Sequence, residues 1–353
     1  MEERIRKLLI GLRQKDIDAL LVASPANISY LTKTSSHDSY FLASPKANIY
    51  FTDSRYTQQV KDDLPKTILL ENIDNGAIKA IARVCLKLGL KKVGFEENRF
   101  TFAQYSKLKA ELKEKITLLP EAGLIEELRQ TKDPQELSCI RKALRITAQA
   151  LEFTKDTLVP GKKEIEIAAE IERFIRYQGA QGSAFDIIVA SGPNSSFPHH
   201  TPGQRRIRNN EPVLVDIGSD YLGYKSDLTR VFFLGKITAY ARNIYNIVSE
   251  AQKRAISRIK PAVSISEIDA AARQFITKKG YGKFFNHSLG HGIGLEVHEA
   301  PRIYGKENDP LVPGEVFTVE PGIYLPGKFG IRIEDMVLVT SKGYEVLSVS
   351  VNK

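Results

Sequence analysis

Two aspartates in the second half of the chain lie beside strongly apolar runs. Asp216 belongs to the run 213–217, and Asp227 follows eleven residues later, just before a second apolar run at 231–234. Strand, turn and strand predict a β-hairpin, on which two acids at this separation face each other from neighbouring strands. An isolated acid of this type is usually a turn or capping residue. The two aspartates therefore indicate a functional site only if other potential metal ligands accompany them.

Histidines provide such residues further along. His287, His291 and His298, three of the chain's six histidines, fall within twelve residues, and glycines flank the middle one. A lone histidine is most often a core residue, but three together favour a site that a ligand can approach closely. The glycine spacing does not match a dinucleotide-binding loop. The segment is also not an HExxH zinc motif, because Arg302 stands where that motif has its second histidine.

Two glutamates complete the set. Glu320 and Glu334 each end or interrupt a β-like apolar stretch, where glutamate is rarely buried unless it is paired or bound to a cation. Four carboxylates cannot share one cleft at neutral pH without strong repulsion, which two divalent cations would neutralise. Mixed carboxylate and imidazole ligands suit manganese, cobalt, iron or zinc, and two such ions can share a hydroxide that attacks a carbonyl. The predicted chemistry is therefore hydrolysis.

The strings around these residues resemble the pita-bread peptidases, which include Xaa-Pro aminopeptidases, prolidases and methionine aminopeptidases, with creatinase as a relative. The resembling strings are VDIGSDYLGYKSDLTR, HSLGHGIGLEVHE, TVEPGIY, GIRIEDMV and SGPNSSFPHH, and, in the first half, TDSRY and GFEENRFTFAQY. The resemblance extends over essentially the whole chain. It implies an α/β (α+β) fold in which a creatinase-like α/β domain, residues 1–128, precedes a catalytic pita-bread domain, residues 129–353, with an internal pseudo-two-fold repeat.

The resemblance also implies roles for individual residues. The five metal ligands would be Asp216, Asp227, His291, Glu320 and Glu334, with Asp227 and Glu334 bridging two divalent ions. The expected ion is Mn²⁺, with Co²⁺, Zn²⁺ or Fe²⁺ as alternatives. Glu320 would also act as general base toward the bridging water.

Four further residues complete the implied site. His298 would stabilise the oxyanion, and His199 would assist with protons or on the proline side, although the sequence does not separate it from His200. His287 would lie on the cleft wall as a substrate contact. Arg332 would fix Glu334 or contact substrate, and a purely structural pairing with a carboxylate is an equal alternative.

Proline specificity rests on the resemblance alone, because proline peptidases carry the extra N-terminal domain. The implied reaction is metal-dependent hydrolysis of the bond between an N-terminal residue and proline, by a hydroxide that bridges the two metals. The alternatives are a prolidase restricted to dipeptides, a creatinase-like hydrolase and a non-catalytic peptide-binding protein. The intact ligand set argues against the last two. The expected partners are peptides with proline at the second position and a second copy of the chain. A loop at 34–39, with His37 and Asp38, would reach the partner's site, but these two are expected to be ordinary loop residues.

Apolar and polar periodicity predicts the elements that carry these residues. In the first domain it predicts helices at 2–15 and 77–88 and strands at 19–23, 48–52, 67–70 and 92–95. A boundary follows at 128–133. Asp133, Pro134 and Glu136 then have the order of a capping box that opens a long amphipathic helix.

An internal repeat follows in the second domain. Residues 160–179 and 261–280 are identical at seven of twenty positions, including a proline at the start and a glycine at the end. A second capping box is predicted from Ser264 to Glu267. Two amphipathic helices can match at apolar positions by chance, but the shared ends favour a duplicated half with a cleft between the copies.

Composition and charge narrow the classes of protein to which the chain could belong. The net charge of +9 is dispersed, its densest part being the stretch 204–208, which argues against nucleic-acid binding. No run reaches the roughly 18 apolar residues of a membrane helix, and the N-terminus lacks the apolar core of a signal peptide. Cys85 and Cys139 are too few for a disulfide framework. These features predict a cytoplasmic protein that does not associate with membranes.

Overall fold

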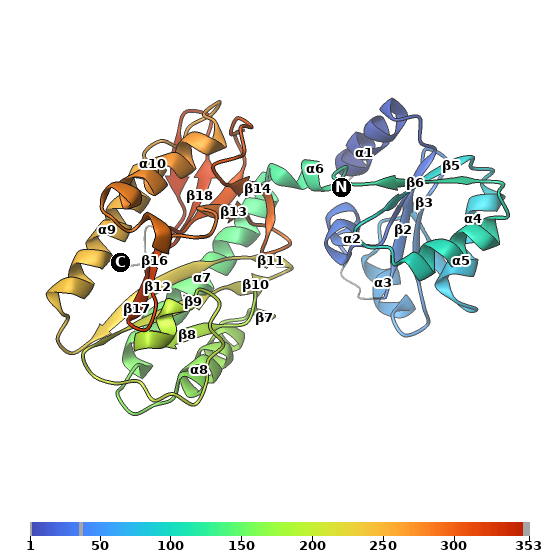
Figure 1. Ribbon diagram of the computed structural model, residues 1–353. Helices are drawn as coiled ribbons and strands as arrows, with labels where there is room; N and C mark the ends of the chain where they lie inside the picture. Colours follow the sequence, from blue (N-terminus) through green and yellow to red (C-terminus); the bar gives the residue numbers. More distant parts are fainter. Residues whose placement is uncertain (1, 35–37, 349–353) are drawn as a thin grey trace. The chain divides into compact units, whose positions relative to one another are not determined.

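The computed structural model describes residues 2–34 and 38–348, and the chain forms two compact units, residues 1–129 and 130–353 (Figure 1). His37 of the predicted 34–39 loop lies outside the described residues. Its neighbour Asp38 pairs with Arg55 of the same unit, with 2.8 Å between carboxylate and guanidinium.

The first unit is a six-stranded mixed sheet with helices packed against it. The strand order is β4-β3-β2-β1-β5-β6, in which β2 runs antiparallel to both β1 and β3, and the β3–β4, β1–β5 and β5–β6 pairs are parallel. The strands are β1 (Ala19–Val22), β2 (Tyr40–Ala43), β3 (Asn48–Thr52), β4 (Ile68–Asn72), β5 (Lys92–Glu96) and β6 (Thr117–Glu121). The helices are α1 (Glu2–Gln14), α2 (Pro25–Thr32), α3 (Thr57–Asp63), α4 (Ala77–Lys87), α5 (Phe102–Leu112) and α6 (Glu126–Gln130).

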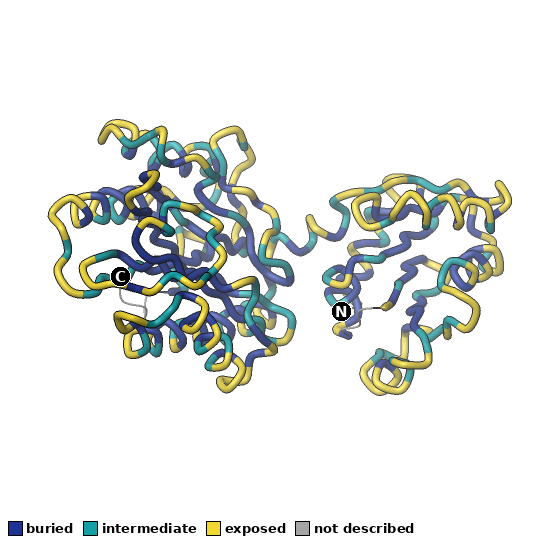
Figure 2. The backbone as a smooth tube through the Cα atoms, turned by 60° about the horizontal axis from the view of Figure 1, so that its bottom comes forward, coloured by how far each residue is buried: buried dark blue, intermediate teal, exposed yellow. Residues whose placement is uncertain are grey.

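Hydrophobic periodicity predicted six of the twelve helices and strands described in this unit. The predicted helices and strands correspond to α1, α4, β1, β3, β4 and β5, whose buried residues form the core of the unit together with those of β2 and α5 (Figure 2). Periodicity did not predict β2, β6, α5 or the shorter helices α2, α3 and α6. β6 has no fully buried residue, so it lacks the apolar alternation that marks a half-buried strand.

The second unit begins with the predicted capping box. Asp133 Oδ1 accepts hydrogen bonds from the amides of Gln135 and Glu136, and Glu136 Oε2 accepts one from the Asp133 amide, each within 3.0 Å. These bonds satisfy donors at the start of α7 (Pro134–Thr157) that have no intrahelical partner.

The predicted repeat is present as two equivalent helical segments. α8 (Glu164–Tyr177) and α10 (Ile265–Lys278) begin 101 residues apart, and each is followed by a glycine with positive φ. The preceding turns make equivalent bonds, from Gly161 N to Ile207 O and from Ala262 N to Leu311 O, both 2.9 Å. The second predicted capping box is wrong, because the Ser264 hydroxyl bonds to Ser266 instead of the helix amides.

The strands of this unit form four small sheets, with order β11-β10-β7, β12-β9-β8, β14-β13-β15-β18-β19 and β16-β17. The apolar faces of α7 and α8 pack with β8 and β9, and those of α9 (Ala239–Ile256) and α10 with β15, β16 and β17. The strands are β7 (Gly182–Ser183), β8 (Ile188–Ser191), β9 (Glu211–Ile217), β10 (Ser219–Tyr221), β11 (Tyr224–Lys225), β12 (Leu228–Leu234), β13 (Gly290–Gly292), β14 (Glu299–Ile303), β15 (Val316–Val319), β16 (Gly322–Leu325), β17 (Phe329–Arg332), β18 (Asp335–Val339) and β19 (Tyr344–Val346). Two 3₁₀ turns are η1 (Gly192–Ser196) and η2 (Gly282–Phe284).

The predicted hairpin forms, but its two acids are not directly opposite. β9 and β12 pair antiparallel with Asp216 opposite Thr229, so Asp227 lies two residues before that position. Residues two apart along a strand share one face of a sheet, which keeps both acids on the same side. The chain between them makes the β10–β11 excursion instead of a tight turn.

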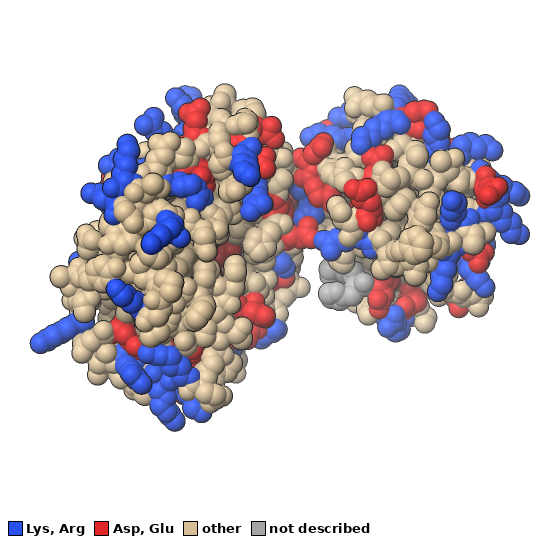
Figure 3. Space-filling model, in the orientation of Figure 1, with Lys and Arg blue, Asp and Glu red and all other residues tan. Residues whose placement is uncertain are grey.

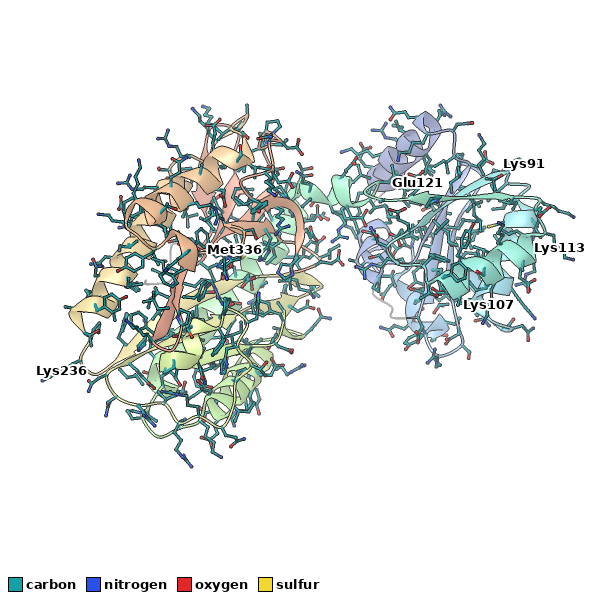
Figure 4. All side chains as sticks on the ribbon, viewed as in Figure 1. Lys91, Lys107, Lys113, Glu121, Lys236 and Met336 are labelled. Atoms are coloured by element: carbon teal, nitrogen blue, oxygen red, sulfur yellow. The ribbon has the colours of Figure 1, made fainter. Side chains whose placement is uncertain are left out.

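Surface charge is dispersed on the face shown in Figure 3, where lysine, arginine and acidic residues are interspersed on each unit. Lys91, Lys107 and Lys113 stand at the margin of the first unit and Lys236 at the end of a loop in the second (Figure 4). Among residues 2–34 and 38–348, no helix is long and apolar enough to cross a membrane.

Candidate metal centre

A cavity of about 860 Å³ in the second unit is lined by all nine residues that the sequence predicts for the site. They come from separate elements: Asp216 from β9, His291 from β13, and the others from strand ends or loops. The nine are His199, Asp216, Asp227, His287, His291, His298, Glu320, Arg332 and Glu334.

Three of the predicted ligands converge closely. One ligand atom each from Asp227, His291 and Glu334 lies within 4.8 Å of the others, a spacing that fits a shared cation. His291 Nε2 lies 3.6 Å from Asp227 Oδ2 and 3.3 Å from Glu320 Oε1. Asp216 is tied to this group by its place on the same sheet face as Asp227.

Unpaired carboxylate oxygens mark where cations fit. Asp216 Oδ1, Asp227 Oδ1 and Glu334 Oε1 are buried and have no hydrogen-bond partner among the described residues. Buried carboxylate oxygens left unpaired are costly, and divalent cations with oxygen and imidazole ligands would remove that cost. The residues present therefore fit a divalent metal group.

The carboxyl pKa values show how crowded the centre is without cations. Burial, together with the charges of Glu334 and Asp216, raises the pKa of Asp227 well above its usual range. Burial and the charges of Glu320 and Asp216 raise the pKa of Glu334 in the same way. Burial alone would also raise the pKa of Glu320, but the hydrogen bond and charge of His291 lower it to about 2. The metal-free centre therefore retains protons that cations would displace.

The His291 ring is oriented for metal binding. Its Nδ1 lies 3.1 Å from the Gly292 carbonyl oxygen, which can only accept, so Nδ1 carries a proton and Nε2 is directed at the carboxylates. Burial would lower the pKa of His291, but the Glu320 carboxylate raises it. The Glu320 carboxylate therefore favours the protonated form of this ring, which a cation at Nε2 would have to displace.

Arg332 connects two of the predicted ligands, Asp216 and Glu334, through hydrogen bonds. Its Nη2 donates to Asp216 Oδ2 over 2.6 Å and its Nη1 to the Tyr324 hydroxyl over 2.9 Å. It does not pair directly with Glu334. Its Nε donates to the Thr229 hydroxyl (3.0 Å), which in turn donates to Glu334 Oε2 (2.7 Å).

Two threonines in the site were not singled out from the sequence. Thr229 links Arg332 to Glu334, and Thr318 accepts from the His291 amide and donates to Glu320 Oε1, both at 3.1 Å. Each lies in an apolar strand, and a hydroxyl there needs a partner. That need was the only signal in the sequence.

Two further cleft histidines, His298 and His287, differ in their surroundings. The His298 ring stands edge-on to His291 with 4.4 Å between centroids, and burial together with His291 lowers the pKa of His298. The His287 Nδ1 donates to the Ser288 carbonyl oxygen, so its Nε2 accepts from the Tyr324 hydroxyl at 3.0 Å. Burial lowers the pKa of His287 and raises that of Tyr324 to about 12, which keeps both neutral.

The structure separates His199 from His200. His200 Nε2 lies 2.8 Å from Glu164 and 3.3 Å from the Asn194 side chain, so this ring is held by the protein. In the described part of the chain no hydrogen bond engages the His199 ring, which lines the same cavity. His199 is thus the histidine whose ring stays available to a substrate.

Two models of known protein families match this chain. A family model described as Metallopeptidase family M24 matches residues 138–341, and one described as Creatinase/Prolidase N-terminal domain matches residues 4–131. The chain belongs to metallopeptidase family M24. This membership confirms the predicted α/β fold, with a creatinase-like N-terminal domain and a pita-bread domain, and the prediction of a metal-dependent peptidase.

Individual relatives cover nearly the whole M24 chain. An Xaa-Pro dipeptidase of Pyrococcus horikoshii is 35% identical over 353 residues, covering 99% of this chain and 97% of the relative. The solved Xaa-Pro dipeptidase from Bacillus anthracis has a TM-score of 0.95 and 38% identity, with 98% and 97% covered. An X-Pro aminopeptidase from Thermotoga maritima has a TM-score of 0.90 and 36% identity, with the same coverage.

Proposed function

We propose that this M24 peptidase hydrolyses the bond between an N-terminal residue and proline, using two divalent cations, with Mn²⁺ expected first. The proposal depends on two observations: Asp216, Asp227 and Glu334 each have a buried carboxylate oxygen with no hydrogen-bond partner among the described residues, and ligand atoms of Asp227, His291 and Glu334 converge. Asp216, Asp227, His291, Glu320 and Glu334 would hold the cations.

The chain's own residues divide the work around the scissile bond. When bound, two divalent cations supply positive charge and lower the pKa of the attacking water. Glu320, ionised and oriented by Thr318, would accept the proton of that water. His298 would donate to the substrate carbonyl oxygen as negative charge develops. His199 would assist on the proline side, and His287 would line the wall.

Arg302 favours dipeptides as substrates. It stands directly opposite His291 in the β13–β14 ladder, so the two side chains project from the same face, and it lines the same cavity. A guanidinium at this place would pair with the free carboxylate of an Xaa-Pro dipeptide. A longer peptide offers no carboxylate there, so an aminopeptidase would gain less from Arg302. The names of the relatives include both activities.

The test compares Leu-Pro with Leu-Pro-Gly, each with Mn²⁺ or Co²⁺ and with a chelator. We expect metal-dependent cleavage of the dipeptide, with Asp227→Ala folded and inactive. Arg302→Met should raise the KM for Leu-Pro about 10-fold or more, since a hydrogen bond to a charged group contributes about 1.5–3 kcal/mol. Equal cleavage of both peptides, unchanged in Arg302→Met, would support an aminopeptidase. No metal-dependent cleavage of either peptide would refute the proposed function.

We also propose that the chain works as a homodimer, as the family resemblance implies. Light scattering should then give twice the 39.5 kDa of one chain. A monomer at assay concentration that retains full activity would contradict this proposal.

A further inference from the structure

The loop that carries His298 is closed by the carboxylate of the next residue. Residues 293–298 have no regular structure and lie between β13 and β14. Glu299, the first residue of β14, folds its side chain back so that Oε1 accepts a hydrogen bond from the Glu296 amide at 2.9 Å. The loop is therefore held from inside by a side chain of the chain itself.

Gly294 makes room for this carboxylate. A Cβ at position 294 would lie 2.8 Å and 3.0 Å from the two Glu299 oxygens, so the carboxylate would have to move to admit it. The Gly294 carbonyl also accepts from the Lys225 amide at 2.7 Å, which attaches the loop to the strand before Asp227. The Glu299 carboxylate thus packs into the space that the missing side chain of Gly294 leaves.

Lys132 supplies the opposite charge. Its Nζ lies 3.3 Å from Glu299 Oε2, and the two side chains are only 1% and 6% exposed. The lysine is itself held, since its Nζ donates to the Gln130 carbonyl (3.1 Å) and its amide to the Gly314 carbonyl (2.8 Å). Removing one member of a buried pair leaves the other charge uncompensated, so the pair makes a stiff attachment.

The Lys132–Glu299 pair lies directly beside His298, to which the proposed function gives a role in the reaction. His298 precedes Glu299 and its ring stands 4.4 Å from that of His291, so a shift of the loop moves His298 relative to the metal centre. A displacement of about 1 Å in such a group can cost about 100-fold in rate.

We propose that Lys132 and Glu299 form a positioning pair that fixes His298 for its role in turnover. The inference rests on the proposed function, because it assigns the pair an effect on that reaction through His298. Glu299 lines the cavity, but its carboxylate is directed to Lys132 and the Glu296 amide, so it acts through its neighbour and not on the substrate.

The test measures kcat, KM and bound metal for Glu299→Gln and Lys132→Met. We expect kcat to fall about 10-fold or more in each variant, as for loss of a residue that orients a site group, with KM and metal content close to wild type. Lys132→Arg should recover part of the kcat of Lys132→Met. The double variant should lose little more than either single variant.

The His298→Ala background separates positioning from general damage. If Glu299 acts through His298, adding Glu299→Gln to His298→Ala should not lower kcat further. Glu96→Gln is the matched control, since Glu96 is a 7% exposed carboxylate that accepts backbone amides in the first unit and should leave kcat unchanged. A further drop in the double variant, lost metal, or an unchanged kcat in Glu299→Gln overturns the proposal.

A readout independent of turnover distinguishes failure of this inference from failure of the proposed function. In histidine-labelled protein, the ring signal assigned through His298→Ala should shift in Glu299→Gln and stay in place in Glu96→Gln. If wild type cleaves no Xaa-Pro peptide but the signal shifts, the proposed function fails and the positioning contact stands. An unmoved His298 signal overturns the positioning pair whatever the activity.

Discussion

The Arg332 guanidinium and the Asp216 carboxylate form a buried ion pair, with 2.6 Å between Nη2 and Oδ2. The same arginine holds the Thr229 hydroxyl and the Tyr324 hydroxyl, so one side chain spans both halves of the duplicated unit. Asp216 keeps its second oxygen unpaired. Arg332 therefore orients a predicted metal ligand and leaves one of its oxygens unpaired.

Arg332→Lys should weaken metal affinity and stability together. Lysine keeps the charge but cannot reproduce the fork of hydrogen bonds, so the loss of stability should be smaller than the cost of about 3–5 kcal/mol for removing one member of a buried pair. Loss of an orienting partner should lower metal affinity about 10- to 100-fold. Titration with Mn²⁺ and urea denaturation measure the two effects.

Arg141→Lys is the control for this change. Arg141 also forks onto a carboxylate, that of Glu345, but the two side chains are 41% and 44% exposed. Exposed pairs contribute about 1 kcal/mol or less, so stability and metal affinity should stay near wild type. Equal losses in both variants would refute the special role of Arg332.

His298→Ala should lower kcat by about 10²–10³-fold, the usual cost of removing an oxyanion stabiliser. Metal content should not change, because the ring contacts His291 but is not among the converging ligands. Steady-state kinetics and metal analysis of the same preparation test this. Loss of metal along with activity would instead make His298 part of the binding site.

Metal binding should release protons. The raised pKa values of Asp227 and Glu334 mean that the folded metal-free chain binds more protons than the unfolded chain above their ordinary values. Stability of the metal-free chain therefore falls as pH rises through the raised pKa values, and apparent metal affinity increases over the same range. Calorimetry in buffers of different ionisation enthalpy measures the protons released. A pH-independent affinity with no release would contradict the crowded centre.

Glu164 should make the stability of the protein depend on pH in the opposite direction. Burial alone would raise its pKa, but hydrogen bonds from Ser191, His200 and Asn194 outweigh burial and lower the pKa below the ordinary 4.5. The stabilisation is present above pH 4.5 and is lost as pH falls through the lower folded value. Glu164→Gln should cost about 1–3 kcal/mol at pH 7 and less near pH 3. Urea denaturation across this range would contradict the assignment if the difference did not shrink.

Residue types and their spacing predicted several features that the structure of this protein contains. The capping box at Asp133, the repeat of 101 residues and the apolar runs of β9 and β12 are local patterns, and each is present in the structure. The candidate metal ligands could also be selected from the sequence, because acids in apolar strands and histidines among glycines need a partner.

Tertiary structure alone decided which of these residues meet. Asp216 stands opposite Thr229 and not Asp227, Arg332 pairs with Asp216 and not Glu334, and Glu164 engages His200 instead of His199. Lys132 meets Glu299 across 167 positions of chain. Strand register and the packing of distant segments set such contacts. A periodic pattern reports which face of an element is buried, but it does not report which residue of another element covers that face.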